Sequence, residues 1–454
     1  MAMPLNNQKR RHFLKFLVGA PSLALMPHIP GLSVAGSGGS SSNANPISTG
    51  YVKNADEAAS VVLSMAQEAN LQGTFGVGGA IIENDTGKIV MVMHNKVLQA
   101  LGSNLGPLSN KIFINDPTAH GERQLVYWYY ENKAALNLPD PSALTVVTSL
   151  DPCAMCAGTL MTSGFNVAVV AHDDFAGVNW DKRADFLGYP TAIQNKLKRY
   201  FGYYGIVGGQ NYSGASSILY SDTRVSKLNA DSCTSVFNDN VQQVRNASNA
   251  SGLDPRDPNN QMVDPSTLSS SSVFRTNYLS SFPDAFKIRL TNYRQPDEIL
   301  KRYLQSLVQQ SIGANNAVAF IDYYGNLLMA SADHFDISPV ATAFMTTLQN
   351  YSKLRFALVN NPITTLLAQK SLSSPKFGTF VFLYAPDGFS TNTLKDMGAY
   401  GSSMEGPIPV VSPSNFQFYE NPLIGTFEDL KALISAMPPL YGPALVNISP
   451  ERVA

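Results

Sequence analysis

The sequence is poor in cysteine, has no excess of basic residues and contains no apolar run long enough to span a bilayer. Only three of its 454 residues are cysteine, which is too few for a disulfide framework. Lysine and arginine total 32 against 33 aspartate and glutamate, so the chain lacks the basic field that binding to a phosphate backbone requires. Its length allows two or three domains. We therefore expect a multidomain protein without a membrane anchor, whose partner is a small molecule and not a nucleic acid.

Two of the cysteines belong to a group of potential metal ligands. His120 lies in the run NDPTAHGE at 115–122, and Cys153 and Cys156 lie in the run SLDPCAMCAG at 149–158. A catalytic zinc site keeps three protein ligands, commonly imidazole and thiolate, and leaves one position open. Glu122 adds a carboxylate that is free to move protons. Apolar residues follow both motifs at helical spacing, so we expect each motif to open a helix. The pattern predicts a catalytic zinc site.

The combination of HxE and PCxMC resembles the cytidine deaminase-like superfamily, and within it the branch of guanine, tRNA adenosine and fungal cytosine deaminases. The run DPTAH at 116–120 is most similar to guanine deaminases, whereas Gly121 is more similar to fungal cytosine deaminases, so the subfamily stays open. The resemblance covers about residues 56–174. It implies a three-layer α/β/α fold with a mixed sheet, and Zn²⁺ bound by His120, Cys153 and Cys156. It also implies hydrolytic deamination of a nucleobase or nucleoside of the guanine, cytosine or adenine type, with Glu122 as the proton shuttle.

The resemblance also points to residues around the zinc site. Apolar runs at 76–83 and 88–94 predict a hairpin, and in the family an asparagine just after the second strand contacts the substrate. The matching residue is Asn95. An asparagine that ends a strand is also a common turn former, and both interpretations stand. Strands are predicted at 144–149 and 166–171 and a further helix at 194–204, while residues 173–180 lie where family members often form a substrate lid.

The ends of the catalytic region are set by changes in composition. Residues 1–35 resemble a twin-arginine signal peptide: a basic run at 9–15, an apolar run at 16–26 and small residues at 33–35. The prediction is a periplasmic or secreted protein; the alternative is a basic tail that binds an acidic partner. A flexible linker follows at 36–50, and the catalytic domain extends over 51–209. Residues 210–295 are rich in Ser, Asn, Asp and Pro and predict a polar, irregular connector.

Residues 296–454 predict a second, degenerate copy of the deaminase-like domain. A helical run at 297–311 and a hairpin at 317–330 repeat the order seen after residue 55, and SPVATAF at 338–344 aligns with 116–122. Residues 384–390 then align with 150–156. Thr342, Phe344, Asp387 and Ser390 replace the three ligands and the glutamate, so we expect no chemistry there. Because family members usually work as dimers, this copy is a candidate intrachain partner. The competing interpretation is that any chain alternating helices and strands gives this coarse pattern.

Other functions also remain open. A secreted deaminase acting on nucleic acid or as an effector would need a basic groove, against which the charge balance argues. A zinc-binding interaction protein without catalysis is the third hypothesis, and it would be favoured if Cys233 closed the coordination sphere. The motifs do not distinguish purine from pyrimidine, or free base from nucleoside, because the loops that shape a pocket lie outside them.

Overall fold

Two five-stranded sheets form the framework of the computed structural model, which describes residues 50–204, 224–402, 408–409, 411–441, 445 and 450–453. The predicted signal peptide at 1–35 and all but the last residue of the predicted linker at 36–50 lie outside the described residues. Among the described residues, no helix is both long and apolar enough to cross a membrane.

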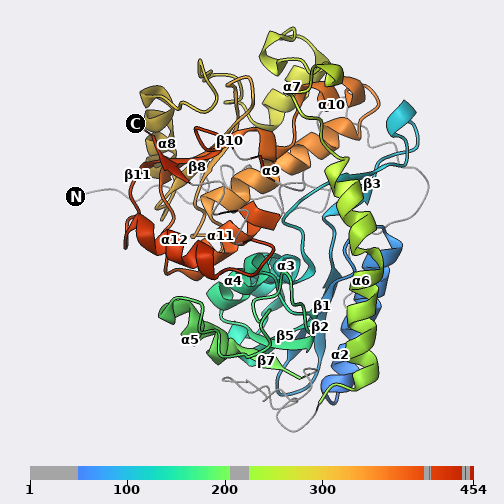
Figure 1. Ribbon diagram of the computed structural model, residues 1–454. Helices are drawn as coiled ribbons and strands as arrows, with labels where there is room; N and C mark the ends of the chain where they lie inside the picture. Colours follow the sequence, from blue (N-terminus) through green and yellow to red (C-terminus); the bar gives the residue numbers. More distant parts are fainter. Residues whose placement is uncertain are drawn as a thin grey trace.

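The first sheet has the strand order β2-β1-β5-β6-β7. Strand β1 pairs antiparallel with β2 and β5, and the pairs β5-β6 and β6-β7 are parallel. One face carries α2 and α6, which lie side by side in Figure 1, and the other carries α3 and α4. This is the three-layer α/β/α arrangement with a mixed sheet that the sequence predicts. The bounds are α2 (Ala55–Leu71), β1 (Gly78–Glu83), β2 (Ile89–His94), α3 (Gly121–Leu136), β5 (Leu144–Leu150), α4 (Ala154–Ser163), β6 (Asn166–Ala171), α5 (Thr191–Tyr200), β7 (Phe201–Tyr203) and α6 (Lys227–Asn249).

The second sheet repeats this topology. Its order is β9-β8-β10-β11-β12, with β8 antiparallel to β9 and β10, and with parallel pairs β10-β11 and β11-β12. The helix, hairpin, helix, strand, helix order that the duplication hypothesis requires is therefore present. Descent of both halves from one duplicated unit stays a prediction. The bounds are α8 (Glu298–Gln310), β8 (Ala317–Ile321), β9 (Leu327–Ala332), α9 (Ala343–Val359), α10 (Thr365–Ser371), β10 (Thr379–Tyr384), α11 (Thr391–Ser402), β11 (Phe416–Glu420), α12 (Phe427–Ala436) and β12 (Glu451–Arg452).

We call the part of the chain built on the first sheet the first half, and the part built on the second sheet the second half. The two halves share one hydrophobic core. It includes Val146 and Val169 from the inner face of the first sheet and Phe320 and Phe382 from the inner face of the second, with the helices between them. Helix α4 packs closely against α11, as Figure 1 shows near the centre of the molecule. Each sheet also has a separate outer core, under α2 and α6 in the first half and under α8 in the second. The helices that follow the zinc motifs are thus buried between the two sheets.

Three segments differ from the sequence-based expectation. The stretch 210–295 is not irregular throughout, because it contains the 23-residue helix α6 and the shorter α7 (Val273–Ser281). Helix α6 escapes prediction since only Cys233, Asn240 and Val244 are buried; its contact with α2 depends on amide hydrogen bonds such as Asn240 Nδ2 to Asn70 Oδ1 at 2.7 Å. The predicted helix 194–204 begins and ends earlier, as α5, and the edge strand β7 follows it. A small hairpin, β3 (Leu98–Ala100) with β4 (Ile112–Ile114), precedes the first zinc motif.

Candidate zinc site

The three predicted metal ligands come from two helix starts that the first sheet brings together. His120 is the N-cap residue of α3, and Cys153 is the N-cap residue of α4, directly after β5. Neither side chain caps its own helix, so both are available to a metal. Cys156 lies one turn further along α4, on the same face as Cys153. Strand β5 pairs between β1 and β6, which fixes where α4 begins relative to α3.

The ligand atoms of His120, Cys153 and Cys156 all lie within 4.8 Å of one another. The Nδ1 atom of His120 is 3.5 Å from the Sγ atom of Cys153. Zinc bonds of about 2.0 to 2.3 Å place tetrahedral ligands roughly 3.3 to 3.8 Å apart, so one Zn²⁺ ion fits among these atoms after they move together by about 1 Å or less. One imidazole and two thiolates are a donor set that suits zinc, with a fourth position left for water.

The pKa values of the two cysteine thiols are shifted in opposite directions. A hydrogen bond from the Cys156 thiol, together with the His120 ring, lowers the pKa of Cys153 well below that of an ordinary cysteine. Burial and the neighbouring Cys153 raise the pKa of Cys156 well above it. A cation placed between the two sulfur atoms would remove this conflict, since it stabilises both thiolates.

Glu122, in the first turn of α3, is 2% exposed and lies beside the metal ligands. Its Oε2 atom is 3.4 Å from Cys156 Sγ, and its Oε1 atom is 3.1 Å from the Thr148 hydroxyl on β5. Burial, and next the negative charge of Cys153, raise the pKa of Glu122. Gly79 on β1 lies underneath: an added Cβ would be 3.0 Å from Leu125 and 4.0 Å from the Glu122 nitrogen. The small residue lets α3 approach the sheet closely enough to place this carboxylate.

Asn95 follows β2, as predicted, and is buried. Its Oδ1 atom accepts hydrogen bonds from Val97 N at 3.0 Å and from the Thr74 hydroxyl at 2.7 Å. These hydrogen bonds are those expected of a turn-forming asparagine. A role of the Nδ2 group in substrate binding stays a prediction.

The loop after β6 lies against the second zinc motif. Gly177 pairs with Cys153 through a backbone bridge, and the carboxylate of Asp173 accepts hydrogen bonds from the Phe175 and Ala176 nitrogens. Phe175 and Trp180 are 40% and 39% exposed. Leu440, from the second half of the chain, donates its N–H to the Phe175 carbonyl at 3.0 Å. The predicted lid segment is therefore next to the site and in contact with the second half, while its role as a lid stays a prediction.

Cys233 is not part of the metal group. The group that the described part of the chain contains has three members, and Cys233 is buried on α6 in the outer core, among residues such as Ala168 and Val170. Burial raises its pKa to about 12. The structure therefore gives no support to a fourth cysteine ligand that would close the zinc site.

The corresponding place in the second half has no ligand set. Thr342 is the N-cap residue of α9, as His120 is of α3, and Phe344 stacks on Phe382 with ring centroids 5.7 Å apart. Helix α11 begins at Thr391, so Ser390, and not Asp387, corresponds to Cys153. Thr393 then corresponds to Cys156, and the alignment based on sequence is three residues out of register. Aromatic packing replaces the glutamate there.

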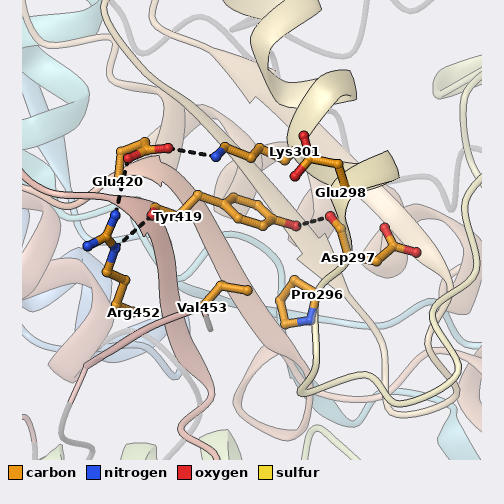
Figure 2. Close-up of a pocket in the computed structure, with 8 residues that line it drawn as sticks. All are labelled: Pro296, Asp297, Glu298, Lys301, Tyr419, Glu420, Arg452 and Val453. Atoms are coloured by element: carbon orange, nitrogen blue, oxygen red, sulfur yellow. Dashed lines mark hydrogen bonds and ion pairs between the residues drawn. The ribbon is translucent and has the colours of Figure 1, made fainter.

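A surface pocket lies elsewhere, at the ends of β11, β12 and α8 (Figure 2). Three of its charged groups bind one another: Lys301 and Arg452 lie 2.6 and 3.5 Å from the Glu420 carboxylate. It contains none of the residues predicted from the sequence. Its lining residues are Pro296, Asp297, Glu298, Lys301, Tyr419, Glu420, Arg452 and Val453.

Sequence reasoning missed the residues that surround the predicted ligands. Thr148 lies outside both motifs, and the sequence shows it only as one residue of a buried strand. Asp116 stands in the first motif, but its partners Gln349 and Lys353 lie more than 200 residues further along the chain. No signal in the sequence joins such distant residues.

Of the comparisons with known proteins, one family model covers the residues of this site. Residues 52–172 match the family model described as the cytidine and deoxycytidylate deaminase zinc-binding region. No curated protein matches the chain. Among solved structures, one from a study of A-to-I editing by tRNA:A34 deaminases has 22% identity over 29% of this chain and 87% of its own, with a TM-score of 0.22. A guanine deaminase from Nitrosomonas europaea has 17% identity over 42% and 87%, with a TM-score of 0.25. Residues 52–172 are thus similar to the zinc-binding region of cytidine and deoxycytidylate deaminases, and the group of His120, Cys153 and Cys156 supports Zn²⁺ as the cofactor.

Proposed function

We propose that this chain is an exported zinc-dependent hydrolase that deaminates a nucleobase or nucleoside of the guanine, cytosine or adenine type. The observation that carries the proposal is the position of the buried Glu122 carboxylate, 3.4 Å from Cys156 Sγ within the group of three ligands. A structural zinc site needs no such carboxylate, whereas hydrolysis needs a group that takes and returns protons.

His120, Cys153 and Cys156 would hold the ion, which when bound supplies a Lewis acid that acidifies water at the open position. Glu122 accepts the proton that the attacking water loses. It returns this proton to the ring nitrogen of the substrate as the water oxygen bonds to the ring carbon. It then moves the remaining proton of that oxygen to the amine, so that the C–N bond breaks, a carbonyl forms and ammonia leaves. The Thr148 hydroxyl, which also lies 2.8 Å from the Leu150 carbonyl oxygen, contacts the Oε1 atom at 3.1 Å, while Oε2 lies beside Cys156.

The protein as a whole supports a small substrate. Its formal net charge is −1, with no basic excess for nucleic acid. Export would follow from the twin-arginine pattern at 9–15, and a zinc ion bound before export would protect both thiolates from oxidation. Fractionation of cells that make the full chain tests this part: we expect the protein in the periplasm or medium, and full-length protein in the cytoplasm would contradict it.

The activity is tested by incubating the zinc-loaded protein with a panel of free bases, nucleosides and a short single-stranded oligonucleotide, and measuring ammonia. We expect turnover of at least one base or nucleoside. The control is Glu122→Gln, which keeps the size of the side chain and leaves the metal ligands in place. It should retain one zinc ion and lose about 10²- to 10⁴-fold in kcat. Ammonia from the oligonucleotide alone, or normal turnover by the variant, would overturn the proposal.

A further inference from the structure

The segment that delivers His120 is held by a buried aspartate. Asp116 is 1% exposed, and its Oδ1 atom accepts hydrogen bonds from the nitrogen and the hydroxyl of Thr118, at 2.9 and 2.5 Å. These bonds close the turn that ends at the zinc ligand two residues later. The position of the His120 backbone therefore depends on the orientation of the Asp116 carboxylate.

The second half of the chain supplies the hydrogen-bond donor to the other oxygen of this carboxylate. Gln349 donates its Nε2–H to Asp116 Oδ2 at 2.9 Å, and Lys353 Nζ lies 3.7 Å from the same oxygen. Both residues belong to α9 and lie one turn apart on one face. In the first half, Arg123 lies at the same distance from Oδ2 as Lys353, 3.7 Å, and donates a hydrogen bond to the Thr118 carbonyl at 3.0 Å.

Other contacts of α9 follow the same segment. Arg355 stacks over Phe113 on β4, 4.8 Å from the ring centroid, and Phe356 also packs near that ring. Strand β4 leads directly into the Asp116 turn. The helix from the second half thus lies along the chain from β4 to Asp116.

The contact is reciprocal between the two halves. Gln349 stands seven residues after the N-cap residue of α9, and Tyr127 stands seven residues after the N-cap residue of α3. Tyr127 donates its hydroxyl to the carbonyl of Val340, which precedes Thr342 as Thr118 precedes His120. Each half thus contacts the segment just before the N-cap residue of the other half's first motif helix, α3 or α9, which is the pattern of a two-fold interface between like subunits.

We infer that Gln349 and Lys353 are positioning residues for the zinc site, so that the metal-free second half completes the metal site of the first. The inference concerns metal binding, and it stands or falls independently of which substrate is deaminated. It assigns to α9 a role that no residue of the zinc motifs reveals: through Asp116, α9 fixes where His120 meets the two cysteines.

The test compares the full-length chain with Gln349→Met and Lys353→Met. Zinc affinity is measured by competition with a chelator, and the geometry of the site by the visible absorption of the Co²⁺-substituted protein. We expect each variant to bind zinc about tenfold more weakly, because residues that orient metal ligands from outside the coordination sphere typically contribute at least this much to metal affinity. We also expect an altered Co²⁺ spectrum.

The matched control is Thr391→Val, which removes the 2.6 Å hydrogen bond between Thr162 and Thr391 at the same interface without touching the Asp116 turn. It should lower the melting temperature to a similar extent but leave zinc affinity and the Co²⁺ spectrum unchanged. If Gln349→Met and Lys353→Met bind zinc as tightly as the native chain, or if Thr391→Val weakens zinc equally, the inference is wrong.

Discussion

Gly158 of α4 and Lys395 of α11 meet at the centre of the interface between the two halves. A Cβ atom added to Gly158 would lie 2.5 Å from the Lys395 nitrogen. Each residue stands five positions after the residue that precedes its helix, Cys153 and Ser390. Thr162, which follows Gly158 along α4, contacts Thr391, which precedes Lys395 along α11. The two helices therefore cross antiparallel about a pseudo-two-fold axis.

The close crossing predicts that Gly158→Ala destabilises the protein. Alanine normally favours a helix over glycine by up to about 1 kcal/mol, but here its Cβ would overlap the backbone of α11. We expect a net loss of about 1 to 3 kcal/mol in the free energy of unfolding, measured by denaturant titration. Gly188→Ala is the control, because an added Cβ there meets nothing within 4 Å. A stabilised Gly158→Ala variant would show that the helices do not approach this closely.

Removal of zinc should expose the thiols in a defined order. With a chelator present, Cys153 should react first with a thiol reagent at neutral pH, because its lowered pKa makes it a thiolate. Cys156, with a raised pKa, should react more slowly. Cys233, whose pKa burial raises to about 12, should react only after unfolding. Counting thiols with and without chelator tests this order, and a zinc-loaded protein whose Cys153 reacts as fast as the metal-free one would contradict it.

The buried charges at Asp116 predict a dependence of stability on pH. Burial alone would raise the pKa of this carboxyl group, but Lys353 and Arg123 outweigh it and lower the pKa below 3.8. A lowered pKa means that the carboxylate stabilises the fold above pH 3.8, and that this contribution is lost as the pH falls through the folded value. Asp116→Asn should therefore cost about 3 kcal/mol at pH 7, because the buried Arg123 and the partly buried Lys353 lose their counter-charge.

The difference in unfolding free energy between Asp116→Asn and the native chain should stay constant from pH 8 to about pH 4 and shrink below that. Urea titrations of metal-free protein at several pH values measure it. Asp140→Asn is the control, since Asp140 pairs with Lys133 at the exposed surface and should contribute less than about 1 kcal/mol. A gap that is absent at pH 7, or undiminished at pH 3, would contradict the assignment.

The parts of this structure that the sequence predicts are those fixed by neighbours along the chain. His120, Glu122, Cys153 and Cys156 stand at helix starts, where capping position and helical spacing decide which side chains share a face. The contact of Gln349 with Asp116 joins residues 233 positions apart, and only the packing of the two sheets brings them together. Helix α6 was missed for a different reason, since its three buried residues give almost no apolar periodicity.

The register of the second motif shows how a local signal can mislead. Aligning Pro386 with Pro152 is natural in the sequence, because both precede a residue pair spaced by three. In the structure Pro152 directly precedes the N-cap residue Cys153, whereas Pro386 lies four residues before Ser390. The Asp387 carboxylate orders the intervening residues by accepting hydrogen bonds from the Phe389 and Ser390 nitrogens.

This register predicts which substitutions would build a second metal site. The triple variant Thr342→His, Ser390→Cys and Thr393→Cys places imidazole and thiols at the positions that correspond to the native ligands. The Ser390 and Thr393 oxygens already lie 3.0 Å apart, and Thr342 reaches α11 through its 2.7 Å bond to Asp396. We expect this variant to bind about one zinc ion more than the native chain. It should gain no activity, because Phe344 cannot move a proton.

The control for this design is the variant Thr342→His, Asp387→Cys, Ser390→Cys, which follows the register expected from the sequence. It carries the same ligand types, but the thiol at position 387 lies in the loop before α11. It also removes the Asp387 carboxylate, which accepts hydrogen bonds within this loop. Metal analysis of both variants after dialysis distinguishes the two registers. An additional zinc ion in the control and none in the first variant would show that the halves do not correspond as their helices indicate.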